Sequence, residues 1–148
     1  MRSIFTLCAT ALAIMSAPAC ANEGRVEIRG GIAWASGVSD ETIGISVGYD
    51  VNVGDNFFVG IEAVADTDFN ISSPVLGLNG RVGFKTGDQG KLFATAGYGY
   101  ETEFELDDVV VGAGYQHNLG SNALVSIQYQ RYLDTDINRA MISLGYRF

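Results

Sequence analysis

The chain has 148 residues, of which 47% are hydrophobic and 18% are charged, and its formal net charge is −8. This length suits one small folded unit and is short for a two-domain enzyme. The composition excludes two classes: the high apolar content disfavours intrinsic disorder, and the acidic balance lacks the basic footprint of a nucleic-acid-binding protein.

The first 21 residues have the features of a cleavable signal peptide. Arg2 supplies a short positive region, residues 4–15 form an apolar run, and Ala19-Cys20-Ala21 has the small-x-small form of a cleavage site. This run is too short for a membrane-spanning helix, and no later stretch approaches the roughly 20 apolar residues that one requires. We therefore expect an exported protein in which residues 1–21 are removed and residues 22–148 form a single domain without cysteine.

From Asn22 to Phe148, apolar and polar residues alternate with period two, which is typical of strands with two different faces. Clusters of turn residues divide this region into eight predicted strands: Arg25–Ala35, Thr42–Val51, Phe57–Ala65, Pro74–Lys85, Lys91–Glu101, Asp108–Asn118, Ala123–Tyr132 and Asn138–Phe148. Each has about the 9 to 11 residues that a tilted strand needs to cross a bilayer.

Two kinds of connection alternate between these segments. Three are Gly/Asn/Asp turns suited to tight hairpins, at Asn52–Asn56, Thr86–Gly90 and Leu119–Asn122. The others, at residues 36–41, 66–73, 102–107 and 133–137, are acidic, and two of them are longer. This order predicts the short-turn end and the loop end of an all-β, eight-stranded antiparallel up-and-down barrel.

The aromatic residues indicate which face of the sheet points outward. On one face they form a belt at each end of the strands, with aliphatic residues between. The short-turn belt is Tyr49, Phe57, Phe84, Tyr115, Tyr146 and Phe148, and the loop-end belt is Trp34, Tyr98, Tyr100 and Tyr129. Amphipathic rings prefer the interfaces of a bilayer, so this pattern predicts a transmembrane barrel with the apolar face toward lipid.

The opposite face is polar and rich in glycine, and we expect it to form a filled lumen. Glycine leaves room in a narrow barrel for long side chains from other strands. Opposite charges in a poorly hydrated interior must pair, which predicts a network of Glu27, Arg29, Glu62, Arg81 and Arg147. Phe58, Phe93 and Leu124 point inward near the short-turn end. This interior is a structural plug or, alternatively, a gate on a small-ion path, and we expect no large pore.

The last segment, Ala140–Phe148, ends its alternation on an aromatic carboxyl-terminal residue. With the preceding features, the chain resembles the small eight-stranded bacterial outer-membrane barrels of the OmpA/OmpX type, including the Ail-like surface proteins. The resemblance implies a porin-family surface protein of the Gram-negative outer membrane, with a structural or surface-interaction role. It also implies that Tyr146 and Phe148 form the signal read by the outer-membrane assembly machinery. The expected partners are this machinery, outer-membrane lipids and lipopolysaccharide, and the expected state is a monomer.

Groups suited to catalysis or to ligand binding are sparse. His117 is the only histidine, and no serine beside it has the spacing of a catalytic pair, so we predict no catalytic, cofactor-binding or metal-binding residues. The acidic loop end lacks the pattern of an ordered Ca²⁺ loop, which favours solvated charge over divalent cation binding. Arg131, on the lipid face at the loop-end belt, is expected to contact a lipid phosphate.

Two alternative functions follow from the same residues. One is an exported soluble barrel of lipocalin-like form, which would turn the apolar face inward around a small ligand. The other is a lipid A-modifying barrel enzyme, in which catalytic groups would face the lipid.

Overall fold

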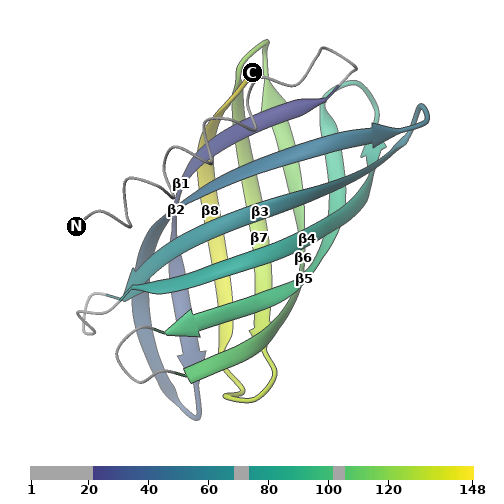
Figure 1. The fold of residues 1–148 in the computed structure, drawn as a ribbon. Coiled ribbons are helices and arrows are strands. Elements are labelled where there is room, and N and C mark those ends of the chain that lie inside the picture. The colour runs from purple at the N-terminus through teal and green to yellow at the C-terminus, as the bar shows by residue number, and fades with distance from the viewer. Residues whose placement is uncertain (1–21, 69–73, 102–105) are drawn as a thin grey trace, which may run out of the picture.

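The computed structural model describes residues 22–68, 74–101 and 106–148, and the predicted signal peptide lies outside this part of the chain. Eight antiparallel strands in sequence order close into one barrel (Figure 1). They are β1 (Glu23–Ala35), β2 (Val38–Val53), β3 (Phe57–Asp68), β4 (Val75–Thr86), β5 (Gly90–Glu101), β6 (Leu106–Leu119), β7 (Ala123–Tyr132) and β8 (Asn138–Arg147). The predicted fold class, an all-β eight-stranded up-and-down barrel, is confirmed.

One connection differs from its prediction. Residues 36–41 are not an acidic loop, because β1 runs to Ala35 and β2 begins at Val38. Ser36 and Gly37, the two residues between the strands, both have positive φ angles, of 49° and 86°. This is the backbone pattern of a tight type I′ hairpin turn, whose twist matches that of the flanking strands. The strands can therefore continue pairing up to Ala35 and Val38.

The barrel closes by antiparallel pairing of β1 with β8. Glu27 lies opposite Gly145, and Arg29 lies opposite Ser143. Both ends of the described chain therefore lie at the short-turn end of the barrel, beside each other (Figure 1).

The outer surface is apolar along every strand. Ile28, Leu78 and Ile127 are 64%, 62% and 58% exposed, respectively, whereas the fully buried side chains include Arg25, Asp50 and Gln116. Such an arrangement is the reverse of a soluble protein and matches a barrel whose outer face is in lipid. The lipocalin-like alternative is therefore wrong, because it required the apolar face inside. In the described residues, no helix has the length and apolar character needed to cross a membrane.

Inward-facing glycines make space for the contents of the barrel. A Cβ atom at Gly145 would lie 2.6 Å from Cγ of Glu27, and one at Gly114 would lie 2.5 Å from the ring of Phe93. Real Cβ atoms do not approach other heavy atoms so closely. These two positions therefore have to be glycine for Glu27 and Phe93 to occupy the lumen.

Candidate functional site

The centre of the interior is a cluster of charges around Arg25 of β1. Its Nε lies 2.8 Å from Glu27, one terminal nitrogen lies 2.8 Å from Asp50, and the other lies 3.4 Å from Glu62. All four side chains are at most 3% exposed. Three neighbouring strands thus place three carboxylates around one guanidinium, which compensates part of the cost of burying them.

From this cluster, ion pairs continue to the short-turn end. Asp50 is 3.2 Å from Nζ of Lys91, and the same nitrogen is 2.8 Å from Glu23 at the start of β1. The second oxygen of Glu23 is 3.0 Å from Arg147 of β8. We call Glu23, Lys91 and Arg147 the mouth triad.

Arg81 of β4 is held mainly by rings rather than by carboxylates. Its guanidinium carbon lies 3.9 Å from the centre of the Phe93 ring and 5.7 Å from that of Phe58. One terminal nitrogen donates a hydrogen bond to Gln116 at 3.3 Å. Phe58 and Phe93, with Leu124, are buried as the sequence placed them, and here the rings also stabilise a cation.

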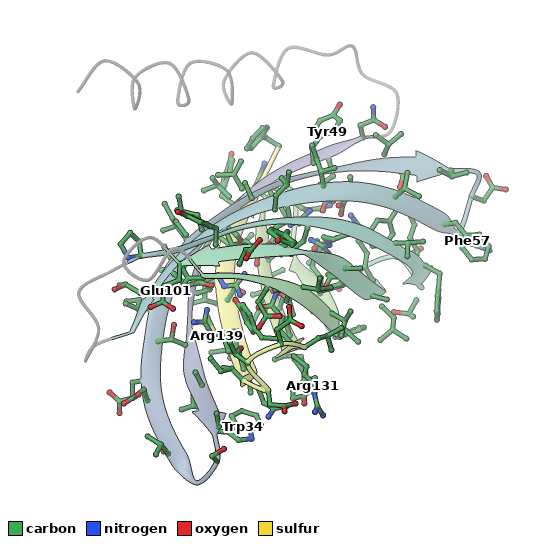
Figure 2. The ribbon with its side chains drawn as sticks, turned by 60° about the horizontal axis from the view of Figure 1, so that its bottom comes forward. Trp34, Tyr49, Phe57, Glu101, Arg131 and Arg139 are labelled. Atoms are coloured by element: carbon green, nitrogen blue, oxygen red, sulfur yellow. The ribbon has the colours of Figure 1, made fainter. Side chains whose placement is uncertain are left out.

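A second charged cluster lies toward the loop end. Asp66 of β3 is 3.1 Å from Arg29 and 3.3 Å from Arg139, which Figure 2 labels inside the barrel. Arg29 also donates to Gln130 at 3.0 Å, and Arg139 donates to the hydroxyl of Tyr132 at 3.2 Å. Polar side chains of four strands, β1, β3, β7 and β8, thus contact one another in this half of the lumen.

At the loop end, the β7–β8 connection is hydrogen-bonded to β6. The carboxylate of Asp108 accepts hydrogen bonds from the backbone N–H groups of Asp134 and Thr135, at 2.9 and 3.0 Å, and from the hydroxyl of Thr135 at 2.6 Å. These bonds fold the connection toward β6. Within the described part of the chain, no group of three or more His, Cys, Asp or Glu residues is arranged to hold a metal ion.

The structure distributes the five residues of the predicted network among separate groups. Glu27 and Glu62 meet at Arg25, Arg29 joins the loop-end cluster, Arg81 lies on the phenylalanines, and Arg147 belongs to the mouth triad. The predicted network lacks Arg25 and Lys91, which contact more carboxylates than the other interior cations do. Period-two alternation carried the missing signal, because Arg25 shares the phase of Glu27 and Arg29.

Of the ten aromatic residues assigned to the two belts, seven have exposed side chains, and Trp34, Tyr49 and Tyr115 are partly exposed. Figure 2 labels Trp34, Tyr49 and Phe57. At the loop end, the rings of Trp34 and Tyr129 are 6.2 Å apart, and the Tyr129 hydroxyl donates to Asn138 at 2.6 Å. Tyr98 donates to Asp107 in the same region. At the opposite end, the backbones of Phe148 and Gly24 exchange two hydrogen bonds of 3.0 Å.

Arg131 lies on the outer surface at the loop end, with its side chain 50% exposed (Figure 2). One of its terminal nitrogens is 2.7 Å from Asp136. A guanidinium has five N–H donors, so this ion pair leaves donors that face outward.

His117 and the interior serines are on opposite faces of the sheet. Nδ1 of His117 is 3.4 Å from the hydroxyl of Tyr115, whose side chain also faces outward. Inside the lumen, the Ser126 hydroxyl donates to Glu27 at 2.9 Å, and its oxygen lies 3.1 Å from the hydroxyl oxygen of Ser143. The structure therefore does not bring His117 together with Ser126 or Ser143.

Comparison with known proteins gives a consistent family and fold. The family model described as outer membrane protein beta-barrel domain matches residues 5–148. No curated protein sequence matches the chain. Among solved structures, Ail of Yersinia pestis is 17% identical, with a TM-score of 0.63, over 86% of this chain and 97% of that chain. Neisserial surface protein A is 12% identical, with a TM-score of 0.60, over 88% and 98%. The outer membrane enzyme PagL is 14% identical, with a TM-score of 0.63, over 84% and 98%.

Proposed function

Because the chain belongs to the outer membrane protein beta-barrel domain family, we propose that it is a structural or surface-interaction barrel with a filled lumen that passes no large solute. The family is one of outer-membrane barrels, and the usual arrangement of such barrels supports an orientation with the short turns toward the periplasm and the loops toward the exterior. Little of the described part of the chain lies outside the strands, so any surface interaction would involve the strand ends and the loops.

The observation that carries this proposal is the packing of the interior. The largest side chains that are less than 2% exposed are Arg25, Phe58, Leu124, Gln116, Gln130, Asp50 and Asp66. They come from β1, β2, β3, β6 and β7 and extend from one charged cluster to the other. An eight-stranded barrel is just wide enough for side chains to fill, so large solutes have no continuous path.

Planar-bilayer recording tests the closed lumen. The reconstituted protein is expected to give no stable large currents, and proteoliposomes are expected not to swell in isotonic sugar. A double variant, Phe58→Ala with Leu124→Ala, removes two plugging side chains and serves as the comparison, after heat-modifiable gel migration has shown that it is folded. Stable, large single-channel currents from the unmodified protein would refute the proposal.

Arg131 supports the lipid part of the proposal, as a contact for a lipopolysaccharide phosphate. Of the eight basic residues after the predicted signal peptide, it alone is on the outer surface at the loop end. A guanidinium binds phosphate oxygens in a bidentate manner. Arg131→Ala is expected to lower the lipopolysaccharide that co-purifies with the barrel. Asp55→Ala, which changes an exposed charged residue at the opposite end, is the control. Unchanged co-purification in Arg131→Ala would count against this contact.

The alternative that the protein is a lipid A-modifying enzyme is tested with the purified barrel and lipopolysaccharide. A lipid A-modifying enzyme would need a nucleophile beside a base, and His117 is the base that faces outward. Mass spectrometry of lipopolysaccharide incubated with the purified protein would reveal removal of an acyl chain. If such a product formed and His117→Ala abolished it, the structural role would be replaced by a catalytic one.

A further inference from the structure

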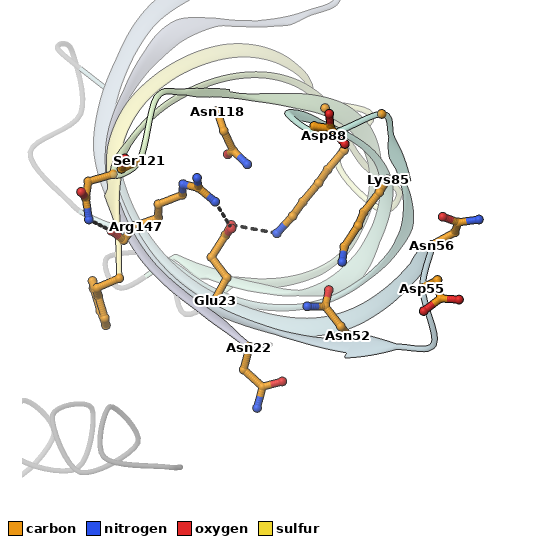
Figure 3. A pocket seen from close by; sticks show the side chains of 15 residues that line it. Asn22, Glu23, Asn52, Asp55, Asn56, Lys85, Asp88, Asn118, Ser121 and Arg147 are labelled. Carbon is orange, nitrogen blue, oxygen red and sulfur yellow. Dashed lines mark hydrogen bonds and ion pairs between the residues drawn. The ribbon is translucent and has the colours of Figure 1, made fainter. Parts of the chain in front are cut away.

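The short-turn mouth of the barrel contains a polar cavity that the proposed function does not use. Its volume is about 740 Å³, and it opens between the three tight turns (Figure 3). This volume is within the range of small-ligand sites, roughly 300 to 1,000 Å³. Unlike most such sites, the cavity is lined mainly by charged and amide side chains.

The side chains that point into the cavity carry more positive than negative charge. Figure 3 shows Lys85 and Arg147 converging on the cavity, with Glu23 as the carboxylate between them, and Lys91 also lines the cavity. Two acidic side chains at the rim, Asp55 and Asp88, are exposed on the turns. The inner wall therefore favours a ligand with negative charge.

The mouth triad shows how an oxyanion is held at this place. One oxygen of Glu23 accepts hydrogen bonds from Lys91 at 2.8 Å and from Gln116 at 2.9 Å. The other oxygen accepts from Arg147 at 3.0 Å. Donors from three different strands thus surround one carboxylate, and that carboxylate is at the first residue of β1.

One cation at the cavity has donors that the protein does not use. The ammonium of Lys85 makes no ion pair or hydrogen bond within the described part of the chain, although its side chain is half-buried in the cavity wall. This ammonium can therefore donate charge-assisted hydrogen bonds to an oxyanion in the cavity.

We propose that the short-turn mouth is an oxyanion-binding site, which takes a small polar molecule bearing carboxylate or phosphate groups from the periplasmic side. Lys85 and Arg147 contact the oxyanion directly. Glu23 occupies part of the site in the free protein, and the ligand competes with its carboxylate for Lys91 and Arg147.

Calorimetric titration of the full barrel, isolated from membranes in a non-ionic detergent, tests the site. Pyrophosphate and citrate are titrated separately at constant ionic strength, so that the tighter probe identifies the preferred oxyanion. We expect saturable binding of at least one probe. Lys85→Gln is expected to weaken it about two- to five-fold, because an ion pair at a partly exposed site contributes little more.

A matched pair of carboxylate variants distinguishes a site from general electrostatics. Glu23→Gln and Asp55→Asn each remove one negative charge from the same mouth, but Figure 3 shows Asp55 pointing away from the cavity. Release of Lys91 and Arg147 predicts tighter binding in Glu23→Gln, with no change in Asp55→Asn. The proposal is overturned if neither probe binds saturably, if Lys85→Gln binds as the unmodified protein does, or if the two carboxylate variants behave alike.

Discussion

At the scale of single residues, the interior is organised by a few cations that each serve several carboxylates. Arg25 is the clearest case, because it is fully buried and within 3.4 Å of Glu27, Asp50 and Glu62. Its three partners are on β1, β2 and β3, so this one guanidinium links three neighbouring strands. The attraction between Arg25 and the three buried carboxylates offsets the repulsion of these carboxylates for one another.

Arg25→Met is therefore expected to lower the free energy of unfolding by about 3 to 5 kcal/mol, the usual loss when one partner of a buried ion pair is removed. Urea titration in detergent, followed by the fluorescence of the single tryptophan, Trp34, measures this loss. Arg131→Met removes the same charge from an exposed ion pair and should change stability by about 0.5 kcal/mol or less. Equal effects of the two substitutions would contradict the central role of Arg25.

At the scale of elements, period-two alternation predicted all eight strands and the face that each presents to the lumen. It did not predict the β1–β2 turn, because Ser36 is not a residue that usually marks a positive φ angle. Nor did alternation reveal which charges pair. Partners such as Arg29 and Asp66 are on strands that are not adjacent, and their contact depends on side-chain reach across the lumen.

Two adjacent glycines of β1 test the difference between the faces. A Cβ atom at Gly31 would collide with the backbone carbonyl of Ala140, whereas one at Gly30 would have only the carbonyl oxygen of Thr42 nearby, at 3.7 Å. Gly31→Ala should therefore destabilise the barrel by about 1 to 3 kcal/mol through overpacking. Gly30→Ala should be neutral or stabilise it by up to about 1 kcal/mol. Urea titration measures the free energy of unfolding of both variants. A greater loss of this free energy in Gly30→Ala than in Gly31→Ala would contradict the assigned faces.

At the scale of the whole molecule, the two ends of the barrel differ. At the loop end, Asp108 holds the β7–β8 connection by hydrogen bonds, and the short-turn end opens into the polar cavity. Between them, two charged clusters and apolar side chains that include Phe58, Phe93 and Leu124 fill the interior. A small ligand can thus enter from the short-turn side and stop at the mouth triad, which agrees with a barrel that binds at one end without conducting.

The seam between β1 and β8 completes the closed sheet, and the last residue of the chain forms its end. Besides the two backbone hydrogen bonds, the ring of Phe148 occupies the space next to Gly24, where a Cβ atom would lie within 3.0 Å of the ring's Cζ and Cδ2 atoms. Tyr146, two residues before Phe148, is paired with Val26 of β1 and has no glycine opposite it in that strand. Phe148 therefore packs across the seam in a way that Tyr146 does not.

Refolding without cellular machinery separates this packing from recognition by the assembly machinery. Purified Phe148→Ala refolded in detergent should convert from the compact to the unfolded gel band at a lower temperature than Tyr146→Ala, because only the former loses the ring across the seam. Both variants remove one outward aromatic side chain, so the loss of contact with detergent is similar. If Tyr146→Ala unfolds first, the C-terminal ring does not stabilise the closed barrel. Residue Phe148 would then matter only for recognition during assembly, where the sequence first suggested its importance.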